Sequence, residues 1–497
     1  MARTRHRFRL AVTAVTAAAL ITLGAPVAAQ DGPVVGTPPV PNALAGWIGT
    51  YVEPEFWTSW ATDAIADGHF NLPYPTDPVK PEVFLPSVPV AEGSNPSPLP
   101  VDHRDWSDFT YEDAGATMTI PSFLLTTRTD GVVLVHDGVV VGEWYRNGYS
   151  ENVRHQPWSV TKTFVAALIG IAHDEGLIGS LQDPIDGYLP DLAGTAWDGV
   201  TIENLLQMES GVHWDEGTPV LVVNTQVEQW LQLALDVYTD GAAGQTRNEF
   251  LAALPRVYEQ GSEFRYNSGN TQVLAWLLET VYGKHFNEVL SEKLWIPMGA
   301  AGDAAMISDR VGDVVASQGL YARSHDFARF GELLRNGGVT PEGRRVLPAG
   351  WVDAMATMTE VSGGQYGYQT WAADLAADDA FTASGFQGQK ISVLPSDCLT
   401  AVRLSYALGA DIRQGDDPLA PDAYGFTVVT YDEEWQRLLR AVADELGVCA
   451  SGSGVDPVGQ PGGDATPVTG GGAALLGVGV ILAAAARRRR RGRARTA

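Results

Sequence analysis

The pattern of hydrophobic and polar residues becomes regular after residue 130. Two runs rich in β-branched residues, 132–135 and 139–145, flank the tripeptide His136-Asp137-Gly138. Asp-Gly between such runs is typical of a β-hairpin, because the tight turn needs positive φ. The sequence therefore predicts two antiparallel strands at this point.

Helical spacing follows the hairpin. From Ser159 to His173 apolar residues recur every three or four positions, and a glycine at position 176 ends the pattern. A second amphipathic helix is expected from Ser324 to Arg335, before a pair of glycines. Further helices are expected from Thr271 onward and over residues 433–446.

Three later strands are predicted over residues 383–394, 399–406 and 426–429. A hairpin, a large helical insertion, three strands and a terminal helix indicate a mixed α/β (α+β) fold. We expect an antiparallel sheet flanked by helices, together with a helical subdomain.

The N-terminus has the pattern of an export signal. Four arginines in the first nine residues precede an apolar run from Leu10 to Leu23, and Val27-Ala28-Ala29 has the small residues that a signal peptidase accepts. The run is shorter than the roughly 20 residues that a spanning helix needs. We therefore expect residues 1–29 to be a signal peptide, with an N-terminal membrane anchor as the alternative.

The rest of the chain divides by composition. Residues 30–108 are rich in proline and aromatic residues, which we interpret as a wrapping segment around a main domain at 109–450. Residues 451–472 are dominated by small and polar residues and form a linker. The apolar segment 473–486 is expected to enter the membrane, and the arginine-rich tail 487–497 to stay cytoplasmic.

A short motif lies just before the apolar segment. Thr466-Pro467-Val468-Thr469-Gly470 resembles the Leu-Pro-x-Thr-Gly sorting signal of Gram-positive surface proteins, which sortase cuts between Thr and Gly. The first position is Thr instead of Leu, so plain membrane retention is the alternative to sortase as a partner. Either outcome displays the protein outside the cell, anchored to the membrane or the cell wall by its C-terminus.

The charge and the cysteine and histidine content bear on which partners and sites the protein can have. The chain has 33 Lys+Arg against 59 Asp+Glu, and 11 of the basic residues lie at the two ends, so the body is strongly acidic. An acidic body argues against nucleic-acid binding through an extended basic face. Cys398 and Cys449 are the only cysteines, and we expect them to pair after export. The nine histidines form no metal-binding cluster, so we expect no metal site.

One serine has the neighbours that a nucleophile needs. In Ser159-Val-Thr-Lys162 the serine opens a helix and the lysine lies on the same helix face, within reach of the serine oxygen. The helix N-terminus favours negative charge, and the serine N–H can face a developing oxyanion. Lys162 is one of only five lysines. The alternative is an N-cap serine followed by a solvated lysine.

Two further motifs follow. Tyr266-Asn267-Ser268-Gly269 lies in a turn-prone stretch, and a tyrosine beside a lysine can act as base toward serine and as acid toward the leaving group. Ala383-Ser384-Gly385-Phe386 is a Gly-rich strand whose backbone can approach a substrate closely. The alternatives are a loop tyrosine that caps the next helix and an ordinary bulge or hairpin.

These three motifs in this order resemble those of the penicillin-recognising serine hydrolases, the superfamily of class C β-lactamases, D-Ala-D-Ala carboxypeptidases and related esterases. The resemblance spans about residues 115–449 and is greatest to the 6-aminohexanoate-dimer (nylon-oligomer) hydrolase branch. It includes the segments Leu205-Leu-Gln-Met-Glu-Ser-Gly211-Val-His-Trp-Asp215 and Asp326-Phe-Ala-Arg-Phe-Gly331.

The resemblance implies acyl transfer to water, with no metal or cofactor. Ser159 would attack a carbonyl, with Lys162 and Tyr266 as a coupled base. The backbone N–H groups of Ser159 and Phe386 would stabilise the oxyanion. The small-molecule substrate would be an amide or an ester.

Three more residues are candidates for substrate binding. Ser268, the third residue of the tyrosine motif, stands where class C enzymes have Asn, as in the amide- and ester-hydrolysing branch. Gly385 belongs to the third motif. Trp214 is a candidate for lining the pocket, with a core position as the alternative.

One departure from the family pattern bears on the substrate. The Lys-Thr-Gly motif of the family appears as Ala383-Ser384-Gly385, so the cation that commonly holds a substrate carboxylate is missing. A site without that cation loses affinity for a carboxylate. Lys390 follows six residues on, but alternation alone does not place it in the pocket. The remaining alternatives are a cell-wall D,D-peptidase, a weak β-lactamase and a catalytically silent surface binding protein.

Overall fold

The computed structural model describes residues 87–214, 246–308, 313–373, 379–405, 409–412, 426–429, 431–447 and 449. The chain divides into two units, Met1–Cys449 and Ala450–Ala497, and every described residue belongs to the first. The predicted signal peptide, the linker with its sorting-like motif, the apolar segment and the basic tail all lie outside the described residues.

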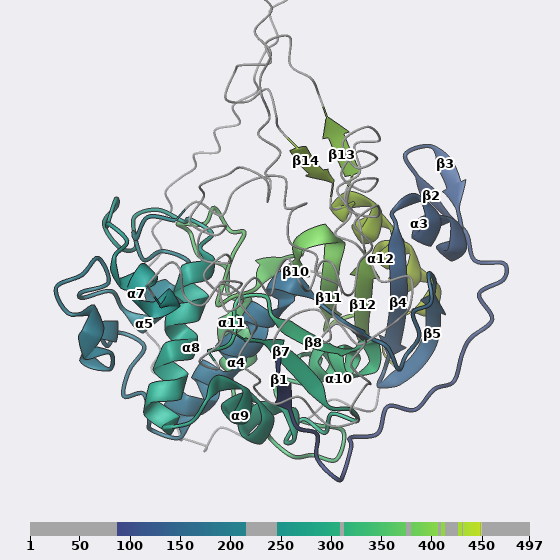
Figure 1. The fold of residues 1–497 in the computed structure, drawn as a ribbon. Coiled ribbons are helices and arrows are strands. Elements are labelled where there is room, and N and C mark those ends of the chain that lie inside the picture. Colours follow the sequence, from purple (N-terminus) through teal and green to yellow (C-terminus); the bar gives the residue numbers. More distant parts are fainter. Residues whose placement is uncertain are drawn as a thin grey trace, which may run out of the picture. The chain divides into compact units, whose positions relative to one another are not determined.

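A six-stranded antiparallel sheet forms the centre of the first unit (Figure 1). Its strand order is β5-β4-β12-β11-β10-β9. The strands are β4 (Thr129–His136), β5 (Val139–Tyr145), β9 (Trp371–Ala372), β10 (Phe381–Gly385), β11 (Gln389–Leu394) and β12 (Leu399–Ser405). The predicted hairpin is confirmed as β4 and β5, and both Asp137 and Gly138 in its turn have positive φ.

Helices cover both faces of this sheet. Alternate residues of β4 point to opposite sides, as the period of a strand requires. Val133 and Val135 join the larger core with the helices α4 and α10, whereas Val132 and Leu134 join a smaller core with α3 and α12. These helices are α3 (Ile120–Thr126), α4 (Thr161–Asp174), α10 (Ser324–Arg335) and α12 (Asp432–Leu446). The nearly continuous apolar run of β4 therefore reflects burial on both faces.

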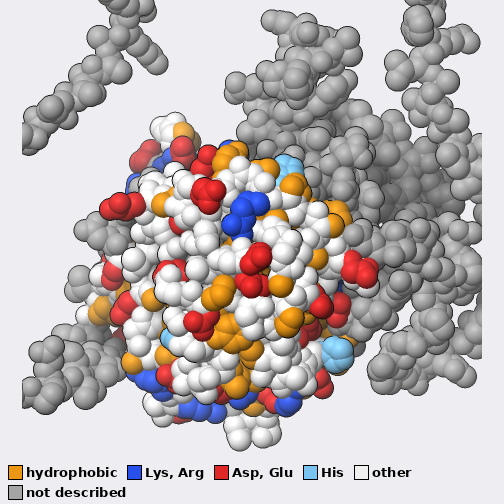
Figure 2. Space-filling model, turned by 90° about the vertical axis from the view of Figure 1, so that its left-hand side faces the viewer, with side chains coloured by type: hydrophobic (Ala, Val, Ile, Leu, Met, Phe, Trp, Pro, Cys, Tyr) orange, Lys and Arg blue, Asp and Glu red, His pale blue; other side chains and the backbone are white. Residues whose placement is uncertain are grey.

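A helical region follows α4 in the chain and carries the tyrosine motif at the start of its longest helix. Its helices are α5 (Ile202–Leu206), α7 (Arg247–Ala252), α8 (Ser268–Tyr282) and α9 (Phe286–Leu290), followed by a π-helix, η6 (Ser291–Trp295). Figure 2 shows this side of the molecule, with acidic side chains scattered over the face and basic ones gathered mainly along its lower edge.

A second, four-stranded antiparallel sheet has the order β1-β7-β8-β6. Its strands are β1 (Ser87–Val90), β6 (Arg154–His155), β7 (Ala304–Ile307) and β8 (Leu320–Arg323). The described part of the predicted wrapping segment begins here, because β1 pairs with β7. The same segment then runs along β5, where the N–H groups of Asp102 and Arg104 donate to the carbonyls of Val140 and Val141.

The remaining described elements are short. They are β2 (Tyr111–Asp113), β3 (Ala116–Met118), β13 (Gly409–Ile412), β14 (Phe426–Val429), α11 (Trp351–Ala356) and the 3₁₀ helices η2 (Trp158–Val160), η3 (Ile185–Gly187), η4 (Pro190–Leu192) and η7 (Phe386–Gly388).

Two predicted boundaries differ from the structure. The strand predicted over 383–394 is wrong as a single element, because η7 splits it into β10 and β11. Gly388 ends that turn with φ 82°, a left-handed conformation that glycine adopts at little cost. The helix predicted from Ser159 begins instead as η2 and becomes the α-helix α4 at Thr161.

A disulfide connects Cys398, in the turn before β12, to Cys449, just after α12. The two Cα atoms lie 5.5 Å apart, and 51 residues separate the cysteines in sequence. The bond therefore fixes the end of the terminal helix to the central sheet. This is the pair that the cysteine count predicts.

Cys398→Ser/Cys449→Ser is expected to lower the free energy of unfolding by about 4 kcal/mol or less, because the unfolded chain regains the entropy of an open loop of this length. Urea denaturation followed by circular dichroism measures the change. Reduction of the wild-type protein should give the same loss, and equal midpoints for oxidised and reduced protein would contradict a stabilising role.

Candidate active site

The turn into α4 places the serine and lysine of the first motif side by side. Trp158 has φ 51°, an uncommon value for a residue with a side chain, and it directly precedes Ser159. Ser159 is a partly exposed residue, whereas Lys162 is only 1% exposed. Lys162 Nζ lies 2.9 Å from Ser159 Oγ. The 3₁₀-to-α transition thus places a partly exposed serine in contact with a buried lysine.

Lys162 is held from two other directions. Its Nζ donates to the carbonyl of Ser317 at 3.1 Å. The same nitrogen lies 4.8 Å from the centre of the Tyr266 ring, within cation–π range. The first and second motifs, 104 positions apart in sequence, therefore meet at this lysine.

An aromatic cluster surrounds Tyr266. The ring of Trp371, on β9, lies 5.4 Å from the Tyr266 ring, and the ring of Tyr366 lies 5.9 Å from it. Phe264 completes the cluster at 5.2 Å from Tyr366. Because β9 pairs with β10, the cluster lies between the second and third motifs. Sequence reasoning missed Tyr366 and Trp371, since nothing near them in the chain marks them.

Gln369 ties this cluster to the helices. Its carbonyl accepts from Thr163 Oγ1 at 2.8 Å, one residue after Lys162. Its side-chain oxygen accepts from Thr271 on α8 at 2.7 Å, and its side-chain nitrogen donates to the carbonyls of Leu205 and Leu206. One buried amide therefore fixes α4, α5 and α8 relative to one another. The sequence held no signal for it.

The first and third motifs touch through their backbones. A Cβ at Gly385 would lie 2.1 Å from the carbonyl oxygen of Pro157, so only glycine fits there. The rings of Trp158 and Phe386 lie 5.4 Å apart. Ser159 and Phe386 each stand in the first turn of a 3₁₀ helix, where an N–H group has no partner within the helix. The predicted oxyanion donors thus belong to two adjoining turns.

A buried polar network holds the turn that carries Ser159 on the sheet. His155 Nε2 lies 3.1 Å from Gln389 Oε1, which also accepts from the N–H of Ser405. Because that oxygen is fixed as an acceptor, His155 carries its proton on Nε2. Burial lowers the pKa of His155 to about 3, so the ring is neutral near pH 7. Its role is to hold the turn.

Ser268 and Trp214 are buried. Ser268 opens α8, whose N-cap is Asn267. Trp214 is 7% exposed, belongs to the larger core and packs so closely on Gly269 that a Cβ there would lie 3.0 Å from its ring. Trp214 therefore supports the start of α8, and a contact of Ser268 or Trp214 with substrate stays a prediction.

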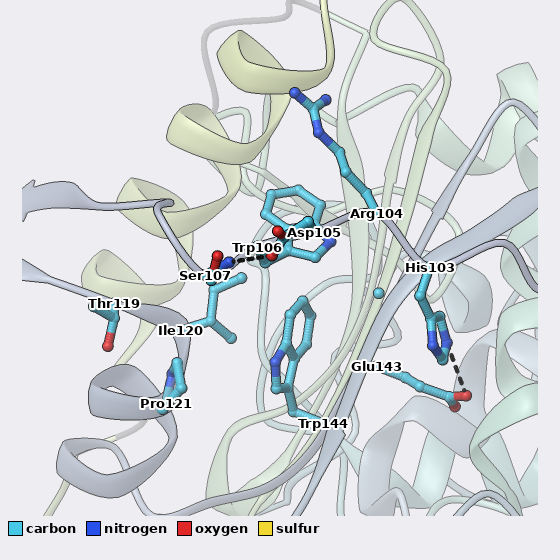
Figure 3. A pocket seen from close by; sticks show the side chains of 11 residues that line it. His103, Arg104, Asp105, Trp106, Ser107, Thr119, Ile120, Pro121, Glu143 and Trp144 are labelled. Carbon is cyan, nitrogen blue, oxygen red and sulfur yellow. Dashed lines mark hydrogen bonds and ion pairs between the residues drawn. The ribbon is translucent and has the colours of Figure 1, made fainter.

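A hollow lies away from these motifs, between residues 103–107, the start of α3 and β5 (Figure 3). Its volume is about 360 Å³. Its polar groups already bond within the protein: Glu143 to His103, the N–H of Ser107 to Asp105, and Trp106 Nε1 to the Val141 carbonyl. None of the three motifs lines it.

Within the described residues, no helix has the length and apolar character needed to cross a bilayer. In the same part of the chain, no three His, Cys, Asp or Glu side chains form a group able to hold a metal ion. The predicted membrane segment, 473–486, lies outside the described residues.

The geometry provides the parts for acyl transfer. The hydroxyl of a partly exposed serine contacts the amine of a buried lysine, a tyrosine ring lies against that amine, and two backbone N–H groups lie in the adjoining turns. Residues 124–424 match the Beta-lactamase family. The chain belongs to this family of penicillin-recognising serine hydrolases.

Two proteins similar to this beta-lactamase-family hydrolase are also named as hydrolases. A 6-aminohexanoate-dimer hydrolase from Paenarthrobacter ureafaciens is 35% identical over 231 residues, which are 46% of this chain and 57% of the relative. A solved structure from Bacillus anthracis, assigned as a candidate 6-aminohexanoate-dimer hydrolase, is 26% identical with a TM-score of 0.63. It covers 73% of this chain and 92% of its own. The chain thus matches little more than half the length of the curated relative.

The neutral, buried state of His155 predicts a pH-dependent stability. An unfolded histidine takes up a proton below about pH 6.5, whereas the folded one resists protonation down to about pH 3. The unfolded state therefore binds more protons, and stability should fall by about 1.4 kcal/mol per pH unit as the pH drops through this window. Urea unfolding of wild type and His155→Gln between pH 7 and 4 measures the slopes.

The His155→Gln variant should have the shallower slope by about that amount. His285→Gln, which alters an exposed histidine, should keep the wild-type slope. A wild-type slope in His155→Gln would contradict the assignment.

Proposed function

We propose that this hydrolase is exported, anchored at the cell surface, and cleaves amide or ester bonds through an acyl-enzyme. The contact that carries this proposal is the one between Lys162 Nζ and Ser159 Oγ at 2.9 Å, with the amine buried. A buried amine beside a hydroxyl is a base positioned to activate it.

In the first half-reaction, Ser159 Oγ bonds to the carbonyl carbon of the substrate. Its proton passes to the Lys162 and Tyr266 pair, while the N–H groups of Ser159 and Phe386 donate to the oxyanion. The bond to the leaving group then breaks, and Tyr266 returns the proton to the departing amine or alcohol. Water attacks the acyl-enzyme and gives a proton to the same pair. The bond between the acyl carbon and Ser159 Oγ then breaks, and the pair passes that proton to Ser159 Oγ as the acid leaves.

The substrate class follows from the relatives. The curated relative and the solved structure are both named for a linear amide dimer, so we assign an amide of that general kind to this chain, together with simple esters. A panel of a nitrophenyl ester, a linear amide dimer, a D-Ala-D-Ala peptide and a chromogenic cephalosporin separates this assignment from a D,D-peptidase or a weak β-lactamase. Rapid turnover of only the last two would reverse it.

Export and anchoring rest on the two ends of the chain. The N-terminal pattern is that of a signal peptide, and the Cys398–Cys449 disulfide suits an oxidising compartment. The apolar segment and the arginines beyond residue 472 would hold the enzyme at the membrane, with sortase as the candidate partner if Thr469-Gly470 is cut.

Ser159→Ala is expected to lower kcat by about a thousandfold or more and to abolish labelling by a serine-directed phosphonate, because the attacking oxygen is gone. Tyr266→Phe keeps the ring on Lys162 but loses the hydroxyl, and should lower kcat by about a hundredfold. Mass spectrometry of the labelled protein and steady-state hydrolysis of the ester are the measurements.

Ser396→Ala, at an exposed serine in the turn before β12, is the matched control and should behave as wild type. Equal labelling of Ser159→Ala and wild type would exclude Ser159 as the nucleophile. Absence of both labelling and turnover in the wild type would favour a silent binding protein.

Removal of residues 450–497 should release active enzyme into the culture medium, since the apolar segment and the basic tail are lost. Activity in the medium and in washed cells is compared with that of the full chain, which should stay with the cells. A truncated protein that remains bound to the cells would place the anchor elsewhere.

A further inference from the structure

The turn that carries Ser159 is held from two sides. β6 leads into this turn and pairs with β8 as far as His155. Consecutive side chains of an extended chain point to opposite sides. His155 bonds to Gln389 on β11, whereas the next residue, Gln156, bonds to the segment 318–321 at the start of β8. The second side therefore reaches the part of the chain that also contacts Lys162.

Gln156 uses both ends of its side-chain amide. Its Nε2 donates to the carbonyl of Gln318 at 2.9 Å, and its Oε1 accepts from the Tyr321 hydroxyl at 3.2 Å. Gln156 is partly exposed, whereas Gln318 is 7% and Tyr321 6% exposed. One side chain thus connects the turn before α4 to two buried residues of another segment.

The carbonyl that Gln156 holds is next to the one that contacts Lys162. Ser317 is fully buried, and its carbonyl accepts from Lys162 Nζ at 3.1 Å. Consecutive peptide planes are rigid and share one Cα atom, so fixing the Gln318 carbonyl restricts that of Ser317. From the other side, the N–H of Gly319 donates to the Val315 carbonyl at 2.7 Å. The Ser317 carbonyl therefore lies in a short segment with an anchor on each side.

A fixed acceptor matters to Lys162 because a lysine amine is a compact group on a flexible stem. A carbonyl only accepts, so one N–H of the amine must point at Ser317 while Nζ stays 2.9 Å from Ser159 Oγ. When the amine takes the serine proton, its bond to this carbonyl becomes charge-assisted and stronger. An interaction that strengthens during the reaction raises the rate and leaves substrate affinity unchanged.

We propose that Gln156 is a positioning residue for Lys162: it holds the Gln318 carbonyl, and thereby the Ser317 carbonyl, in place for the amine that takes the serine proton. The inference rests on the proposed acyl-transfer function. Gln156 acts through the lysine and not on the substrate. Its loss should therefore slow the attack by Ser159 without weakening binding.

Labelling of the full chain by a serine-directed phosphonate tests this, because it follows the attack by Ser159 alone. Gln156→Met keeps the length of the side chain and loses both bonds, and Gln156→Glu loses the donor to Gln318. Both should lower the labelling rate at saturating phosphonate by about tenfold, while the half-saturating concentration changes by less than about twofold. Tyr321→Phe removes only the support of Gln156 and should cost about threefold or less.

The extent of labelling separates positioning from plain destabilisation. Every molecule of Gln156→Met should be labelled in the end, whereas a partly unfolded variant would stop short. In a Lys162→Met background, the slow residual labelling should not fall further on Gln156→Met, because the glutamine acts through the lysine. Gln182→Met, which removes an exposed glutamine that bonds to Glu203, is the control and should behave as wild type.

A wild-type labelling rate in both Gln156 variants would overturn the proposal. So would a change in the half-saturating concentration alone, or an equal further loss in the Lys162→Met background. Failure of the proposed function would look different, since the wild type would neither hydrolyse a nitrophenyl ester nor react with a phosphonate.

Discussion

The contact between the buried amine of Lys162 and the hydroxyl of Ser159 is the constraint on which the site depends. Lys162 is 1% exposed, and Ser159, the Ser317 carbonyl and the Tyr266 ring all lie against its amine. A buried amine without such partners would be costly, since desolvation disfavours its charged form. The helical region and the sheet must therefore close together on α4 for the lysine to be tolerated at all.

Buried hydrogen bonds fix the residues around the site. The carbonyl and the side-chain amide of Gln369 bond to α4, α5 and α8, and His155 holds the turn that carries Ser159 through Gln389. Between them, Tyr366 and Trp371 brace the ring of Tyr266. The reactive groups are thus carried by secondary-structure ends whose positions are set by buried amides and aromatic rings, which is the arrangement that preorganised catalysis requires.

Local spacing predicted the groups that lie within one helical turn or one hairpin. Ser159 and Lys162 could be predicted because residues three positions apart lie on the same face of a helix. The β4–β5 hairpin could be predicted because Asp-Gly favours a tight turn. Gln369 and Trp371 could not be predicted in this way, since each contacts residues far away in the sequence. The prediction of a single strand over 383–394 is wrong for another reason. The alternation of apolar residues is the same for one long strand as for two strands joined by a tight turn. Recognising the turn at Gly388 would have paired Ser384 with Lys390.

The disulfide would have a consequence if the proposed C-terminal anchor holds this chain at the cell surface. Cys449 is the last residue of the first unit, and the second unit begins at the next residue. A pull on that unit passes through the sulfur bridge into the turn between β11 and β12, where it meets the central strands of the six-stranded sheet. Without the bridge, the same force would act directly on the end of α12. The disulfide would thus direct a pulling force into the central sheet and spare α12.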